Sequence, residues 1–203
     1  KILLKNQKNE KKNMKIFRAT RYQISQWFGK DRTDPGTMPF YIELGILGHN
    51  GIDEACPTDS NIYFNCDTKG TVIGSGVYND GAKYLRILTK ENGKFYIHRY
   101  LHIKEAKVVA GQLVDTGDLI AISDNTGKYT TGAHLHYDLS PVDENYNYID
   151  KLNGYGGQID PQPFYENIWC VDKVNFQLST IGILTKLLNV LKLLVGIKVN
   201  KIE

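Results

Sequence analysis

The stretch His134-Leu135-His136-Tyr137-Asp138-Leu139 alternates in character from one residue to the next. Such alternation predicts a β-strand, because successive side chains of a strand point to opposite faces. His134, His136 and Asp138 are therefore expected on one face, and the two leucines on the other. The two imidazoles would lie roughly 6.5–7 Å apart along the backbone. One could bind a metal ion while the other reaches a substrate atom, although such a pair also suits an ordinary polar strand face.

The chain on the N-terminal side of this stretch, from residue 46 onward, also has the pattern of strands and turns. β-branched and aromatic residues favour four further strands, at Ile62-Tyr63-Phe64, Thr71-Val72-Ile73, Tyr84 to Leu88 and Lys94 to His102. Asn79-Asp80-Gly81 and Glu91-Asn92-Gly93 predict hairpin turns between them. A short strand and glycine-turn unit repeats over residues 108–122. No helical period interrupts this span, so the sequence predicts an all-β, antiparallel domain.

Length and composition suit one such domain with extensions. The chain has 203 residues, of which 41% are hydrophobic, and a formal net charge of +3. We expect a basic tail at 1–15, the main folded domain at 16–167 and a C-terminal extension at 168–203. The small positive charge and the lack of an Arg-rich motif argue against nucleic-acid binding.

Two segments are predicted to be loops. Residues 29–39 are rich in Gly, Asp and Pro, which favour turns. Residues 140–167 are rich in Asp, Asn, Gly, Pro and Tyr, and are expected to form a long loop that closes over or beside the domain. Long ordered loops often carry function.

The C-terminal run Ile181–Ile197 differs from everything before it. Thr185, Lys186, Asn189 and Lys192 recur every three or four residues among Leu, Val and Ile, which predicts an amphipathic helix. The run is too short and too polar for a transmembrane span. Its wide apolar face could pack on its own domain, contact another chain or bind a membrane surface.

The remaining local signals are weaker. Cys56, Cys66 and Cys170 are an odd set that favours buried thiols, although Cys56 and Cys66 could pair across a hairpin. No secretory signal is visible, and Met14 could be a natural start. An extracellular protein would then need another exit route, or a signal in a part of the start that is missing from this sequence.

Two more histidine segments complete the chemical pattern. His49 and Asp53 lie four residues apart in a Gly-containing turn that could aim both side chains at one point. His102 closes the strand that begins near Phe95, where alternation places Tyr96, His98 and Tyr100 on the same face. His98 is interpreted as structural or groove-lining rather than catalytic, because it lies roughly 13 Å from the strand end.

In this order the motifs resemble the lysostaphin- and LytM-type zinc endopeptidases. The resemblance is carried by Gly48-His49-Asn50-Gly51-Ile52-Asp53, by Tyr100-Leu101-His102 followed by Gly111 to Asp118, and by Asn125-Thr126-Gly127 with Thr131 to Asp138. It spans about residues 45–140, with Trp27-Phe28-Gly29 upstream and Asp160-Pro161 at the end. Ala133 and Glu54 depart from the family pattern, which usually has Pro and an apolar residue there.

The resemblance implies antiparallel sheets that form an open groove, as in LytM-like folds, and a single Zn²⁺ ion. It implies that His49, Asp53 and His136 bind this ion. His134 would act as general base or orient the water, and His102 would stabilise the oxyanion or assist the leaving amine. Asp138 would orient an imidazole as an outer-shell acceptor. Tyr100 and Tyr137 are expected to bind substrate, with Tyr146, Tyr148 and Tyr155 as further groove residues.

The implied substrate is bacterial peptidoglycan, cut at its peptide stem or cross-bridge. This points to an extracellular or cell-envelope location, with a phage tail or lysis system as an alternative setting. Self-association or particle docking through 181–197 is compatible with hydrolysis.

Three other readings stay open. A degenerate wall-binding domain would bind without cutting, and a structural particle component would use its termini for docking. A sugar-transport phosphocarrier would phosphorylate a histidine without a metal.

Overall fold

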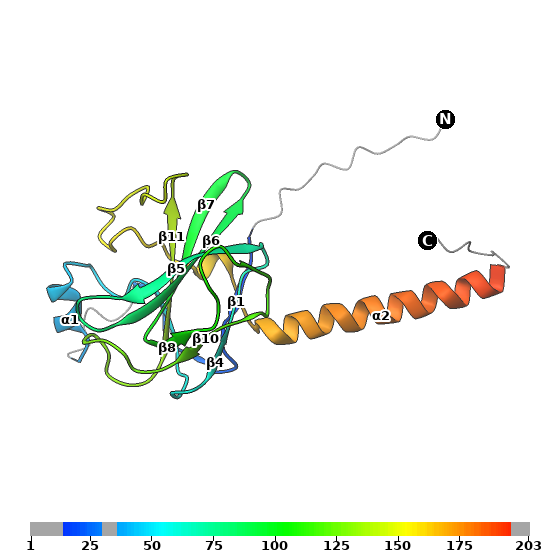
Figure 1. Cartoon of the computed structure of the whole chain (residues 1–203), viewed down its shortest axis with the longest axis horizontal. Coiled ribbons are helices and arrows are strands. Elements are labelled where there is room, and N and C mark those ends of the chain that lie inside the picture. Colours follow the sequence, from blue (N-terminus) through cyan, green and yellow to red (C-terminus); the bar gives the residue numbers. More distant parts are fainter. Residues whose placement is uncertain (1–13, 30–35, 196–203) are drawn as a thin grey trace.

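Strands dominate the molecule. The computed structural model describes residues 14–29 and 36–195 (Figure 1). Residues 1–13 of the predicted tail, residues 30–35 of the predicted loop, and the end of the C-terminal extension from 196 lie outside the described residues. The elements are β1 Ile16–Arg18, β2 Ile24–Gln26, α1 Met38–Glu43, β3 Ile52–Glu54, β4 Asn61–Tyr63, β5 Gly70–Val77, β6 Lys83–Glu91, β7 Lys94–Leu101, β8 Ile103–Ala106, β9 Leu113–Val114, β10 Leu119–Ser123, β11 Leu135–Val142, η1 Gln162–Phe164, β12 Tyr165–Trp169 and α2 Cys170–Val195.

A seven-stranded sheet organises the fold, in the order β2-β3-β11-β7-β6-β5-β9. Its pairs are antiparallel, as are those of a three-stranded sheet in the order β4-β10-β8. The prediction of an antiparallel all-β domain is confirmed. The one departure is β1, which pairs with β12 in parallel and so fastens the start of the domain to its end.

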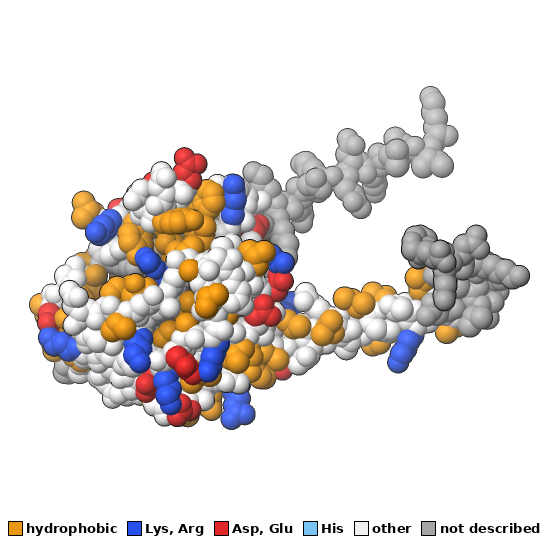
Figure 2. Space-filling view, in the orientation of Figure 1, with side chains coloured by type: hydrophobic (Ala, Val, Ile, Leu, Met, Phe, Trp, Pro, Cys, Tyr) orange, Lys and Arg blue, Asp and Glu red, His pale blue; other side chains and the backbone are white. Residues whose placement is uncertain are grey.

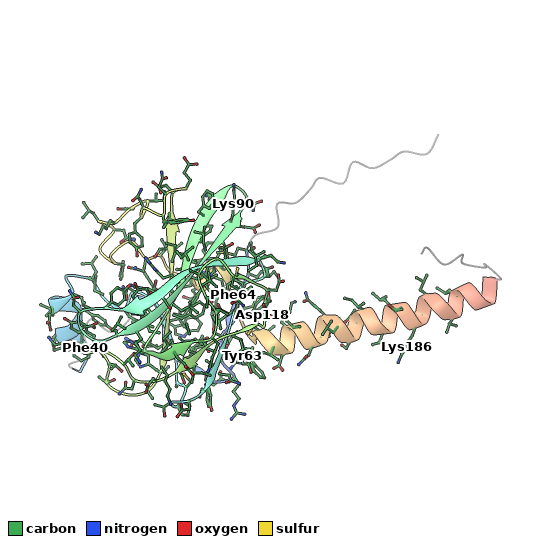
Figure 3. The ribbon with its side chains drawn as sticks, viewed as in Figure 1. Phe40, Tyr63, Phe64, Lys90, Asp118 and Lys186 are labelled. Atoms are coloured by element: carbon green, nitrogen blue, oxygen red, sulfur yellow. The ribbon has the colours of Figure 1, made fainter. Side chains whose placement is uncertain are left out.

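The two predicted hairpins join β5 to β6 and β6 to β7. At the second turn Asn92 has φ 50° and Gly93 has φ 82°. Positive φ at both central residues is the signature of a tight hairpin turn whose twist matches its strands, and it explains the Asn-Gly pair. Lys90 marks this hairpin in Figure 3, at the end of the sheet farthest from β4.

The large sheet has one face toward the core and one toward solvent. Leu85, Tyr100 and Tyr137 are neighbours across β6, β7 and β11 and are 0–1% exposed, within the hydrophobic core. Residues one step along these strands, such as Arg99 and Asp138, lie on the opposite face. Asp53 and His136 share that opposite face, because they pair directly across β3 and β11.

The prediction that Tyr100 and Tyr137 bind substrate is wrong. Both rings are buried, at 0% and 1% exposure, and they pack on each other at 5.4 Å between centroids. The Tyr100 hydroxyl donates to Asn65, and the Tyr137 hydroxyl bonds His98. Strand alternation puts them on the core face, opposite His136.

Glu54 is fully buried, and its position accounts for the departure from the family pattern. Its carboxylate accepts hydrogen bonds from the backbone N–H of Ala19 and Thr20 and from the Thr20 hydroxyl. Burial raises the pKa of Glu54 to about 7. The side chain thus holds the N-terminal segment against β3.

The cysteines are free, buried thiols, so a Cys56–Cys66 disulfide is absent and the buried-thiol interpretation is confirmed.

Helix α2 is longer than predicted and stands away from the domain (Figure 1). It starts at Cys170 rather than Ile181, and only its first turns contact the domain, with Val174 beside Gly117. Ile181, Leu184, Leu188 and Leu191 are 51–60% exposed. Figure 2 shows apolar side chains along this helix, and Lys186 lies far from the domain in Figure 3. The alternative in which the run packs back on its own domain is therefore wrong. Among the described residues, no helix has the length and hydropathy that crossing a bilayer requires.

Candidate metal centre and groove

Three side chains from separate parts of the chain converge on one point. Asp53 lies on β3 and His136 lies opposite it on β11, so their side chains emerge side by side from the sheet. His49 comes from the turn that leads into β3. All three are buried, with 4–8% exposure. They form a group that could hold a metal ion.

The distances between the potential ligand atoms fit a small tetrahedral ion. His49 Nε2 lies 3.1 Å from Asp53 Oδ1 and 3.0 Å from His136 Nδ1, and the last two atoms are 2.9 Å apart. Two ligands of a tetrahedral zinc ion with bonds of ~2.0–2.1 Å lie ~3.3 Å apart. A slight outward movement of each side chain would therefore accommodate the ion.

Backbone contacts fix the His49 ring. Its Nδ1–H donates to the Trp27 carbonyl at 3.1 Å, and the Gly29 N–H donates to the His49 carbonyl at 2.7 Å. Because Nδ1 carries the proton in this arrangement, Nε2 keeps its lone pair for a ligand. The upstream Trp27-Phe28-Gly29 match is therefore part of the site.

Gly51 leaves room for the His136 ring. A Cβ at this position would lie 2.6 Å from His136 Nε2 and 2.5 Å from the Tyr137 carbonyl oxygen. Both distances are far below van der Waals contact, so any other residue would displace the ring or the strand. The glycine between His49 and Asp53 is required by packing at this point.

His102 and His134 stand beside the three potential ligands without joining them. Their rings are 4.6 Å apart, and His134 Nε2 lies 3.7 Å from Asp53 Oδ1. Each Nδ1–H donates to a backbone carbonyl, that of Thr126 at 2.6 Å for His102 and that of Gly132 at 2.7 Å for His134. Each Nε2 is consequently left with a lone pair that can accept a proton.

Comparison with known proteins agrees with this geometry. The family model for peptidase family M23 matches residues 47–150, about half of the chain. The chain belongs to peptidase family M23. Its LytM- and lysostaphin-type resemblance is thereby confirmed, and so is the predicted class of fold.

Two curated relatives of this family illustrate the extent of the match. Peptidoglycan DD-endopeptidase ShyA of Vibrio cholerae is 34% identical over 120 residues, which are 59% of this chain and 26% of that protein. Lysostaphin of Staphylococcus simulans is 27% identical over 153 residues, 73% of this chain and 28% of its own length. The chain thus spans only about a quarter of the length of these relatives.

Solved structures within the same family share the fold. A structure of LytU has a TM-score of 0.51 and 35% identity, and the match covers 73% of this chain and 86% of that one. A zinc-containing peptidase from Vibrio cholerae has a TM-score of 0.53 and 25% identity, over 78% of this chain and 41% of its own.

The histidines open into a groove of about 700 Å³. Aromatic residues line it: Phe40 and Tyr41 on α1, Tyr78 after β5, and Tyr129 and Tyr148 in loops. Of the five tyrosines proposed from the sequence, only Tyr148 is a lining residue. Figure 3 shows Phe40 on α1, at the end of the domain opposite α2. Residues 143–161, between β11 and η1, form a wall here through Tyr148 and Gln158. The loop predicted at 140–167 is thus shorter than expected, because its first residues belong to β11 and its last ones to η1 and β12.

Electrostatics separate the roles of the histidines. Burial, with His134 and His136 nearby, lowers the pKa of His102 to about 4, so its imidazole is neutral at neutral pH. Burial opposes a charge on His136, but Asp138 and Asp53 outweigh it and raise the pKa of His136 to about 9. Metal binding requires the neutral imidazole, so an ion at this site would displace that proton.

Proposed function

We propose that this protein is a zinc-dependent endopeptidase that hydrolyses peptide bonds in bacterial peptidoglycan. The observation that carries the proposal is the convergence of His49 Nε2, Asp53 Oδ1 and His136 Nδ1 on one point of an open groove, with two further imidazoles beside it. Two His and one carboxylate are the ligand set of many catalytic zinc sites. The names of ShyA and of the zinc-containing peptidase support both the ion and the substrate class.

The roles of the site residues follow from which of their nitrogen and oxygen atoms are available to bind an ion or to accept a proton. His49, Asp53 and His136 would hold the ion. When bound, it supplies Lewis acidity toward a peptide carbonyl and acidifies water. His134 Nε2 and His102 Nε2 can each accept a proton from an attacking water and then donate it to the leaving amine. His102 can donate to a developing oxyanion only after such uptake, because its Nδ1–H is committed to the Thr126 carbonyl.

Digestion of purified cell walls tests the proposal directly. We expect the full chain to release new amino termini, detected by mass spectrometry of the fragments, from walls of at least one of several species. A chelator should abolish the release and Zn²⁺ should restore it. Binding without release in every species would favour the wall-binding alternative, and phosphorylation of a histidine without zinc would favour the phosphocarrier.

Location and organisation follow from this proposal. A peptidoglycan substrate places the protein outside the cell or in the envelope, with a phage tail or lysis system as the alternative setting. The core, which begins at Met14, and the pairing of β1 with β12, which reaches Trp169, support a catalytic unit a few residues longer than the predicted 16–167. Helix α2 would then be a separate extension.

We also propose that α2 associates with α2 of a second copy of this chain. Ile181, Leu184, Leu188 and Leu191 recur at spacings of three and four residues, which form one continuous apolar seam. Isoleucine and leucine at alternating spacings of three and four residues suit the packing of one helix against an identical one. A single helix with such a seam in water is poorly stabilised.

Light scattering of the full chain measures this association. We expect a dimer or larger assembly at micromolar concentration, and a monomer after Leu184→Lys with Leu188→Lys. The control carries the same added charge on polar positions, Ser179→Lys with Thr185→Lys, and should assemble like the unmodified chain. A monomeric unmodified chain would contradict the proposal.

A further inference from the structure

A salt bridge lies on the groove face of the sheet, behind the proposed ligand His136. Asp138 follows His136 by two residues on β11, so both side chains point to the same face. Arg99 is the direct neighbour of Asp138 across the β7–β11 pair. The Asp138 side chain is 0% exposed and that of Arg99 is 14% exposed. This is a buried ion pair within the groove wall, where Arg99 is also a lining residue.

The ion pair is connected to His136 through Asp138. Arg99 Nε and one terminal nitrogen each lie 2.7 Å from Asp138 Oδ2. The same Oδ2 lies 3.4 Å from His136 Nε2, the ring nitrogen that faces away from the potential ligand point. The second oxygen of Asp138 has no hydrogen-bond partner among the described residues. All the directed contacts of this carboxylate therefore fall on the oxygen shared by Arg99 and His136.

Arg99 is itself held in place by other groups. Its third nitrogen donates to the Tyr78 hydroxyl at 3.0 Å, and its guanidinium lies 5.8 Å from the centre of the Tyr78 ring. A planar guanidinium that donates two N–H groups to one carboxylate oxygen fixes the orientation of the carboxylate and also balances its charge. The pair is therefore rigid enough to set the angle of a neighbouring ring.

We propose that Arg99 is a positioning residue for the metal ligand His136 and acts through Asp138. The proposal rests on the proposed function, in which His136 Nδ1 binds Zn²⁺. Arg99 holds Asp138 Oδ2 where it accepts the His136 Nε2–H, and this contact keeps Nδ1 aimed at the ion. Groups that hydrogen-bond a ligating histidine in this way typically change metal affinity 10–100-fold when they are removed.

Zinc affinity of the full chain, measured by competition with a chromogenic chelator, tests this role apart from catalysis. We expect Arg99→Gln and Asp138→Asn each to weaken zinc binding by about 10-fold or more. Their double variant should lose little beyond the larger single effect, because both act on the same contact. Arg86→Gln is the matched control: Arg86 is the neighbour of Arg99 across β6 and β7 but lies over the Tyr84 ring. It should bind zinc within about twofold of the unmodified chain.

Each outcome bears on a distinct claim. An unmodified chain that binds no zinc would refute the proposed function itself. Zinc binding by the unmodified chain, with equal affinities in Arg99→Gln and Arg86→Gln, would overturn only the role of Arg99. If Arg99→Gln does not fold, Arg99→Lys replaces it. Lysine has a single nitrogen, so this variant should still bind zinc more weakly than Arg86→Lys does. Equal zinc affinities in these two variants would overturn the role of Arg99. In the zinc-loaded unmodified chain, NMR should show a His136 Nε2–H resonance protected from exchange, and a rapidly exchanging proton would contradict the contact.

Discussion

His136→Ala is expected to remove zinc binding and, with it, cleavage of cell walls. The ring carries one of the three proposed ligand atoms, which lie 2.9–3.1 Å apart, and His49 and Asp53 alone would leave the ion with too few protein ligands. We expect zinc affinity to fall more than the 10–100-fold that is typical of losing an outer-shell contact. Zinc content after dialysis, measured by atomic absorption, gives the result independently of activity.

His98→Asn is the control for this substitution. His98 is also buried, but it lies on the core face of the sheet, where it bonds Thr89 and the Tyr137 hydroxyl. Its replacement should cost about 1–3 kcal/mol of stability through unsatisfied buried groups, while zinc stays bound. A His136→Ala protein that stays fully loaded with zinc would show that the ligand assignment is wrong.

Substitution of His102 or His134 is expected to leave zinc bound but to remove most of the cleavage activity. Neither ring is among the three potential ligands, while each presents a free Nε2 beside them. Loss of one proton-transfer group typically reduces the rate by about 10²–10⁴-fold. We expect that loss in kcat for His102→Ala and His134→Ala, with zinc content unchanged, measured on a defined wall peptide.

The backbone at His102 calls for a second variant. Its φ of 60° is left-handed, a conformation that Asn adopts more readily than Ala. His102→Asn thus removes the imidazole with less backbone strain and should be as inactive as His102→Ala. Activity near that of the unmodified protein in either His102 or His134 variant would exclude that residue from proton transfer.

The alternation of polar and apolar residues was sufficient to predict β11 and the shared face of His136 and Asp138. It left β1, β2, β3 and β12 unrecognised, because these strands have only three to five residues. The same rule failed between Tyr100 and His102, because it assumes that a strand continues. The left-handed φ of His102 ends β7 and turns the imidazole toward the groove, while Tyr100 stays in the core. A single residue of unusual backbone conformation leaves no mark in a hydrophobic pattern.

Other parts of the site depend on contacts between distant segments. Arg99 could not be recognised from its own surroundings, since its importance comes from the register that sets it opposite Asp138. Tyr41 and Phe40 lie on α1, whose six residues are too few for a helical period. For α2 the pattern predicted a helix, but periodicity gives no information on whether an apolar face is covered.

Because Asp53 pairs directly with His136 across β3 and β11, a bound ion would link these two strands in addition to its catalytic role. An ion held by both strands favours the folded chain over the unfolded one, by about 4 kcal/mol when free zinc exceeds its dissociation constant 1,000-fold. Loss of zinc would then loosen the middle of the large sheet. A protein built in this way would resist heat and digestion by other proteases best in surroundings that keep it supplied with metal.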